Sequence, residues 1–111
     1  MRRKYTQMRE DATKYPLDSY NELSKAQQRI FTFLMKSRGA NNQQRIQNIE
    51  IADRLDVHAQ HVSHDLKAVI DLDMIRRGKY NLIMINPNMW FAGDVFAHND
   101  AVIMWNDLFK S

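Results

Sequence analysis

Three histidines stand at intervals of three residues in the stretch HAQHVSH, which covers residues 58–64. Imidazoles this close together can ligate a metal ion or move protons in catalysis. In a helix each residue advances about 100° around the axis, so His58, His61 and His64 point in directions about 60° apart from one to the next. The outer two then diverge by about 120°. Because zinc needs ligands that converge tetrahedrally, the spacing argues against a metal site.

The rest of the chain offers no set of residues suited to catalysis or cofactor binding. It has no cysteine, no serine in a glycine-rich nucleophile motif, and no pair of carboxylates placed for acid–base work. We therefore predict that the protein is not an enzyme and uses neither a metal ion nor another cofactor. The lack of cysteine favours a reducing, cytoplasmic location. No apolar run reaches the roughly 20 residues of a membrane helix, so no membrane partner is expected.

The residues around the histidines predict two helices joined by a tight turn. Residues 48–55 have helical periodicity, and Asp56-Val57 interrupts it. Helical spacing resumes at residues 58–72, where a single apolar stripe consists of Val62, Leu66, Val69 and Ile70. An earlier helix begins after the N-cap residue Ser24 and ends near Gly39. A short strand is expected at residues 44–47.

The period changes after residue 72. Residues 73–86 predict a β-hairpin with its turn around Gly78, and a last helix follows Asp94, its expected cap. The fold class is therefore mainly α with a small β-hairpin (α+β), a winged helix-turn-helix. Pro16 argues against a helix in residues 1–20, which we interpret as a flexible basic N-terminal arm. Residues 21–111 form the domain, with a C-terminal dimerisation helix.

The polar face of the helix at residues 58–72 suits double-stranded DNA. Its first two turns place no carboxylate on that face, and glutamine, serine, histidine and lysine can all contact base edges. The expected contacts are His58, Gln60, His61, Ser63, His64 and Lys67. A solvated helix face would also be polar. The preceding helix, the turn and the basic hairpin are what favour DNA.

Basic residues elsewhere add candidate phosphate contacts. Arg76, Arg77 and Lys79 surround the hairpin turn, and in a winged helix they would lie beside the recognition helix. Residues 1–15 carry five basic and two acidic side chains, and Arg2, Arg3 and Lys4 could reach a neighbouring groove. Lys25, at the start of the first predicted helix, is a further candidate.

The C-terminal third carries many aromatic and methionine side chains and three acidic residues against one basic residue. An apolar surplus beyond the core marks a partner surface. We expect a homodimer, because a single winged helix reads only a short site. The expected dimer contacts are Trp90, Phe91, Phe96, Val102, Trp105 and Phe109. The competing interpretation places all of these residues in the core.

The stretch NIEIADRLDVHAQHVSHDLKAVIDLDMIRRGKYNLIMINPNMWFAGD resembles the winged-helix domain of RepL-type plasmid replication proteins. The exit from the hairpin, GKYNLIMINPNMWFAGD, carries most of the likeness: a glycine, an aromatic residue, a strand, Asn-Pro, an apolar pair and a glycine. The resemblance covers roughly residues 24–110. It implies binding at a plasmid origin and a role in starting or controlling replication, with the replication machinery as a partner.

Two alternatives share the same fold. A winged-helix transcriptional repressor would use the same recognition helix at a promoter instead of an origin. A protein-interaction module would have lost DNA binding and would act through its aromatic C-terminal face. Asp56 and Asp73 stand where glycine is usual in winged helices, and His58 replaces the common serine or threonine cap.

Overall fold

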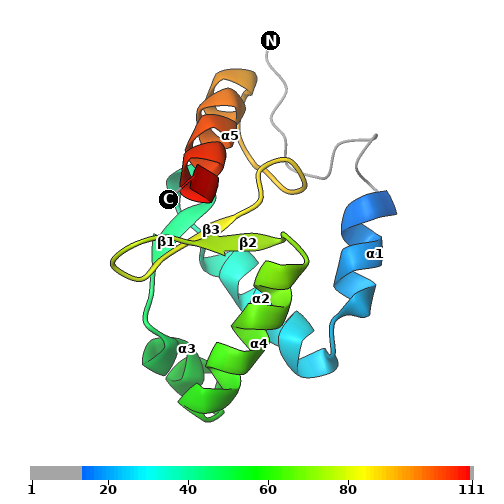
Figure 1. The fold of residues 1–111 in the computed structure, drawn as a ribbon, viewed down its shortest axis with the longest axis vertical. Helices are drawn as coiled ribbons and strands as arrows, with labels where there is room; N and C mark the ends of the chain where they lie inside the picture. Colours follow the sequence, from blue (N-terminus) through cyan, green and yellow to red (C-terminus); the bar gives the residue numbers. More distant parts are fainter. Residues whose placement is uncertain (1–13, 111) are drawn as a thin grey trace.

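A computed structural model describes residues 14–110 of the chain, with side chains from 17 to 108 (Figure 1). The helices are α1 (Lys14–Glu22), α2 (Lys25–Ser37), the short 3-10 helix η2 (Ala40–Asn42), α3 (Asn48–Leu55), α4 (Ala59–Asp71) and α5 (Val95–Lys110). The strands are β1 (Gln43–Arg45), β2 (Ile75–Arg77) and β3 (Leu82–Ile85). These elements follow the order that the sequence predicts, with α1 added at the start.

The three strands form one antiparallel sheet in the order β1-β3-β2. The sheet lies between α5 on one side and α2, α3 and α4 on the other (Figure 1). Side chains alternate along a strand, so the central strand β3 serves both layers. Ile83 and Ile85 join the core formed with α2, α3 and α4, and Met84 packs with α5. This arrangement is the predicted winged helix-turn-helix, with the β2–β3 hairpin as the wing.

The start of α2 is fixed as the sequence predicts. The Ser24 hydroxyl accepts a hydrogen bond from the Gln27 amide, and the Gln27 side chain accepts one from the Ser24 amide. This reciprocal capping box satisfies two backbone donors that a helix start leaves without partners. The apolar residues Ile30, Phe31 and Leu34 then face the core.

The first predicted boundary needs correction, because α1 occupies residues that the sequence assigned to an arm. Pro16 lies in the first turn of α1, where a backbone N–H has no partner within the helix, so proline is tolerated there. Ser19 and Leu23 are buried and tie the end of α1 to the domain.

The wing turn is also displaced from its predicted place. Tyr80 and Asn81 both have positive φ (58° and 62°), and the Leu82 amide donates to the Lys79 carbonyl. The strand register places Gly78 opposite Leu82, so Lys79, Tyr80 and Asn81 form a three-residue hairpin loop. Gly78 precedes the turn, and a Cβ atom there would lie 2.9 Å from Leu108 Cδ2 of α5. Its small size serves close packing between the wing and α5.

A buried asparagine joins the end of α2 to the exit of the sheet. Asn42 Nδ2 donates to the carbonyls of Ile85 and Trp90, and its Oδ1 accepts from Arg38 Nε. Burial lowers the pKa of the Arg38 guanidinium from its ordinary value. These bonds hold η2 against β3 and support the loop that leads to α5.

The turn between α3 and α4 depends on a left-handed residue. Asp56 has φ 56° and ψ 51°, a conformation that costs an L-residue about 1–2 kcal/mol and glycine almost nothing. Glycine loses more backbone entropy on folding, which offsets part of that gain. We expect Asp56→Gly to raise the free energy of unfolding by about 0.5–1 kcal/mol, measured by urea denaturation.

Asp53→Gly is the matched control, because Asp53 is an exposed residue inside α3. At that position glycine relieves no left-handed conformation and brings only its poor helix propensity. The free energy of unfolding should therefore fall by about 0.5 kcal/mol. Shifts of the same sign in the two variants would contradict the role given to the left-handed conformation.

Candidate nucleic-acid interface

The face of α4 that the sequence singled out is exposed. Val62, Leu66 and Val69 are buried and orient the helix. The side chains of His58, Gln60, His61, Ser63, His64 and Lys67 are all exposed. His58 is the N-cap residue, and its side chain makes no capping hydrogen bond. A continuous polar surface therefore runs from the start of α4 through its third turn.

The two carboxylates of α4 are either engaged or distant from its first two turns. Asp65 is half-buried, and its Oδ1 accepts a hydrogen bond of 3.5 Å from Gln27 Nε2 of α2, so it points toward the domain. Lys67 Nζ lies 3.4 Å from Asp71 Oδ2, with both side chains mostly exposed. Such a surface ion pair contributes little, so the lysine can exchange its partner for another anion.

The histidines show no arrangement suited to a metal. The rings of His58 and His61 meet edge to face, with centroids 5.6 Å apart. Within the described residues, no three histidine, aspartate or glutamate side chains are grouped so that they could hold a metal ion. The fourth histidine, His98, is buried in α5, where its Nε2 lies 2.7 Å from the Pro87 carbonyl oxygen.

The wing carries two of the predicted basic residues in different settings. Lys79 is exposed at the tip, beside Tyr80, whose side chain is 81% exposed. Arg77 is half-buried, and its Nη1 donates to Asn48 Oδ1 at 3.1 Å, which links the wing to the start of α3. Lys79 is therefore the basic residue of the wing with the most freedom to meet a phosphate.

Arg45 holds the wing tip and was missed by the sequence analysis. Its Nη1 donates to the carbonyls of Lys79 and Tyr80, both at 3.0 Å. The guanidinium is exposed and adds positive charge beside the tip. The sequence does show a basic residue in a short predicted strand. That this strand pairs with a strand of the wing is visible only in the fold.

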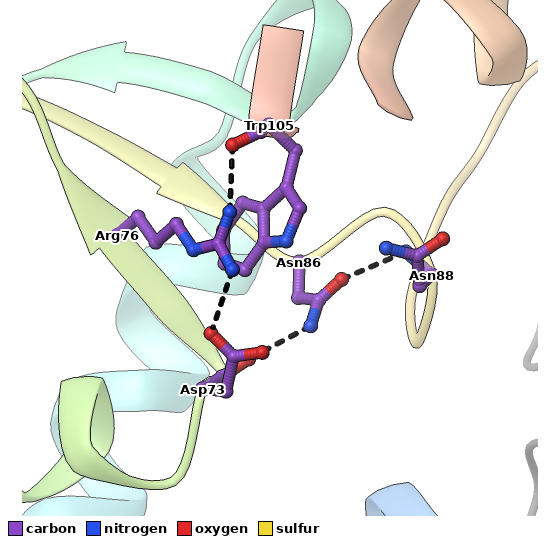
Figure 2. A network of polar contacts seen from close by, with 5 residues as sticks. All are labelled: Asp73, Arg76, Asn86, Asn88 and Trp105. Carbon is purple, nitrogen blue, oxygen red and sulfur yellow. Dashed lines mark hydrogen bonds and ion pairs between the residues drawn. The ribbon is translucent and has the colours of Figure 1, made fainter. Parts of the chain in front are cut away.

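Arg76 does not belong to this surface, which corrects the prediction that it contacts DNA. It pairs with Met84 across the strands and so shares the face of the sheet that α5 covers. Its guanidinium lies over the ring of Trp105 with Cζ 4.0 Å from the centroid, and Nη1 donates to the Trp105 carbonyl at 2.7 Å. Figure 2 shows these contacts together with the ion pair to Asp73.

Asn86 fixes the base of the wing. Its Nδ2 donates to the Asp73 carbonyl at 2.8 Å, and its Oδ1 accepts from the Asn88 amide at 2.9 Å (Figure 2). Asp73 itself has a positive φ of 58° in the link between α4 and β2. The network fixes the direction in which the wing leaves the end of α4.

Four DNA candidates remain. Arg2, Arg3 and Lys4 lie outside the described residues. Lys25 is exposed but lines a groove on α2 together with Arg29 and Lys36.

The predicted dimer residues require the largest correction. Trp105 and Phe91 are buried against Met84. The centroid of the Trp90 ring lies 4.9 Å from the centroid of the Phe31 ring. Phe91 and Trp105 are therefore core residues on the α5 side of the sheet, whereas Trp90 is half-buried and packs against the core on the other side. Val102 is half-buried and Phe96 is 68% exposed, while the side chain of Phe109 lies outside the described residues. Among the side chains of α5 that the structure describes, the exposed large apolar residues are Val95, Phe96, Ile103 and Met104.

Comparison with known proteins identifies one family. A family model described as Firmicute plasmid replication protein (RepL) matches residues 18–109. No curated protein and no solved structure matches the chain. None of the described helices is both long enough and apolar enough to cross a membrane.

The different settings of Arg76 and Lys79 predict different effects on stability. Arg76→Gln removes an ion pair, a charge-assisted hydrogen bond and the contact with the Trp105 ring, so the free energy of unfolding should fall by about 1–3 kcal/mol. Lys79→Gln should change it by less than about 0.5 kcal/mol, because the side chain is exposed. Urea denaturation of both variants tests this. Equal losses would refute the inward placement of Arg76.

Proposed function

We propose, since the chain belongs to the RepL family of Firmicute plasmid replication proteins, that it binds double-stranded DNA at the plasmid origin and starts or controls replication there. The family membership establishes a role related to plasmid replication. The proposal adds the ligand and the surface: α4 enters the major groove, and the wing lies along the neighbouring backbone. The protein acts in the cytoplasm by binding, with no catalysis of its own.

The observation that carries the proposal is the exposed polar face of α4. Gln60 can form two hydrogen bonds to an adenine edge, while Ser63 and His64 can donate to or accept from base edges. Lys67 can reach a guanine or a phosphate. These side chains are exposed, and the nearby carboxylate of Asp65 turns toward α2. A helix whose first two turns present short polar groups and no outward carboxylate can approach the phosphate backbone closely.

The wing supplies the sequence-independent part of binding. Lys79 at the tip is the main phosphate contact, and Arg77 and Arg45 add positive charge behind it. Arg45 also holds the tip in place through two backbone carbonyls, so the lysine meets the backbone at a fixed distance from α4. Arg2, Arg3 and Lys4 are proposed to extend the contact into an adjacent groove.

Binding of more than one copy completes the proposal. A single recognition helix reads only a few base pairs, so two copies on neighbouring sites increase specificity. The copies then present a composite surface to the replication machinery. Because Phe91 and Trp105 are buried and Trp90 packs against the core, the contact between copies is proposed to use other residues.

Binding to duplexes from the region around the gene itself tests the proposal. Gln60→Ala and His64→Ala should weaken binding to the origin sequence by about 1–3 kcal/mol each and leave binding to random duplex unchanged. Lys79→Ala should weaken both alike and reduce the slope of log K against log salt by about 0.9. Fluorescence anisotropy over a range of salt concentrations gives both quantities.

Asp18→Ala is a matched control, because Asp18 is exposed on α1 and takes no part in the proposed surface. It should bind like the unmodified chain. Failure of the unmodified chain to bind any duplex at low salt would refute DNA binding and favour a protein-interaction module. Binding that maps to a promoter and is dispensable for plasmid maintenance would favour the repressor.

A further inference from the structure

A second charged surface lies on α2, away from the recognition helix. It is an open groove of about 570 Å³ whose rim carries Lys25, Arg29 and Lys36. Its apolar lining comes from Tyr20 of α1, Phe33 of α2 and Leu55 of α3. Basic side chains along an apolar floor suit a ligand that is both acidic and apolar. We call this surface the α2 groove.

The three cations lie in one line along α2. At about 100° per residue, Lys25, Arg29 and Lys36 fall within about 40° of one another around the helix axis. Arg29 and Lys36 are seven residues apart, which corresponds to about 10 Å along the helix. All three are exposed, α2 contains no acidic residue, and the described residues provide no ion-pair partner for any of them.

The α2 groove faces away from the proposed DNA surface. The buried residues Ile30, Phe31 and Leu34 lie on the opposite side of α2 from the line of cations. Gln27, which also lies on that opposite side, reaches Asp65 of α4. A straight duplex held against α4 is therefore on the other side of α2, and the groove needs a different partner.

The exposed face of α5 has the complementary chemistry. Asp100 and Asp107 are exposed and stand seven residues apart, the same spacing as Arg29 and Lys36. Ile103 lies between them on the same face and is 60% exposed. From Asp94 to Leu108 the sequence has three acidic residues and neither lysine nor arginine. This face offers two carboxylates and an aliphatic side chain to a basic, apolar groove.

We propose that α5 of one copy docks into the α2 groove of a second copy, with Asp100 and Asp107 against Arg29 and Lys36. A helix laid into an apolar groove is a recurrent mode of recognition. The pairing cannot occur within one chain, because the sheet separates α5 from α2 (Figure 1). The N-terminal arm is an unsuitable occupant, since residues 1–13 carry four basic and two acidic side chains.

This contact is head-to-tail, because each copy uses two different surfaces. Such interfaces build rings or open chains, whereas a two-fold dimer uses the same patch twice. A docked pair of copies leaves one groove and one α5 face available for further copies. If the proposed DNA binding holds, neighbouring copies would read sites repeated in the same orientation, and this consequence alone rests on that function.

Charge reversal on each surface tests the contact without DNA. Analytical ultracentrifugation at low salt should show that the average mass of the unmodified chain rises with concentration and falls when salt is added. The double variants Arg29→Glu/Lys36→Glu and Asp100→Lys/Asp107→Lys should each associate at least tenfold more weakly. A mixture of the two should associate again, since the acidic α5 of the first matches the basic groove of the second.

The double variant Lys67→Glu/Lys79→Glu is the control, because it alters charge on the DNA side by the same amount. Its self-association should equal that of the unmodified chain even where DNA binding is lost, so failures of the two proposals are distinguishable. An unmodified chain that stays monomeric would overturn the contact. So would self-association that persists in Arg29→Glu/Lys36→Glu, as in a two-fold dimer through α5.

A nucleic-acid occupant is the remaining outcome. If a single-stranded oligonucleotide binds the unmodified chain, binding is lost in Arg29→Glu/Lys36→Glu and the chain does not self-associate, the groove holds nucleic acid. The proposed contact is then wrong.

Discussion

Burial of β3 on both faces is the constraint on which the other elements depend. Ile83 and Ile85 complete the core that orients α4, and Met84 between them packs against Phe91 and Trp105 on the opposite side. If only one face of the sheet were covered, Met84 of β3 and Arg76 of β2 would lie in water. The aromatic rings that now enclose them would be exposed as well. Because the same strand also forms half of the wing, the positions of α4, wing and α5 are set by one element.

The histidines of α4 illustrate how geometry decides between two chemistries available to the same side chains. The outer two of three imidazoles at intervals of three on a helix diverge by about 120°, so the three do not converge readily on one ion. The same divergence spreads them along an exposed surface, where each can contact a different group of a ligand. Burial of Val62, Leu66 and Val69 holds that surface outward, and the exposure of the polar side chains is what makes it available.

The distribution of charge gives the domain three separate surfaces. The α4 and wing surface presents histidines and lysine, α2 presents a line of cations beside apolar side chains, and α5 presents carboxylates beside exposed apolar groups. A small net charge conceals this division, since the basic and acidic surfaces nearly cancel. The division suits a protein that combines an anionic ligand on one side with contacts between copies on the others.

The sequence alone determined the winged helix-turn-helix and the exposed face of α4, because both follow from local periodicity. Apolar residues three and four apart define a buried helical stripe, and the remaining positions must then face outward. The N-cap at Ser24 and the cap at Asp94 are likewise local, and both are present. The conformations of Asp56 and Asp73 match positions where glycine is usual, for the same local reason.

Only the tertiary structure decided which basic and aromatic residues face water. Arg76, Arg77 and Lys79 are neighbours in sequence, yet one packs on Trp105, one bonds to Asn48 and one is exposed. Phe91 and Trp105 became core because α5 covers the second face of the sheet, and Trp90 packs against Phe31 on the first face. Because side chains alternate along a strand, neighbouring side chains point to opposite faces of the sheet. Which of these faces is covered depends on where a helix distant in the sequence packs.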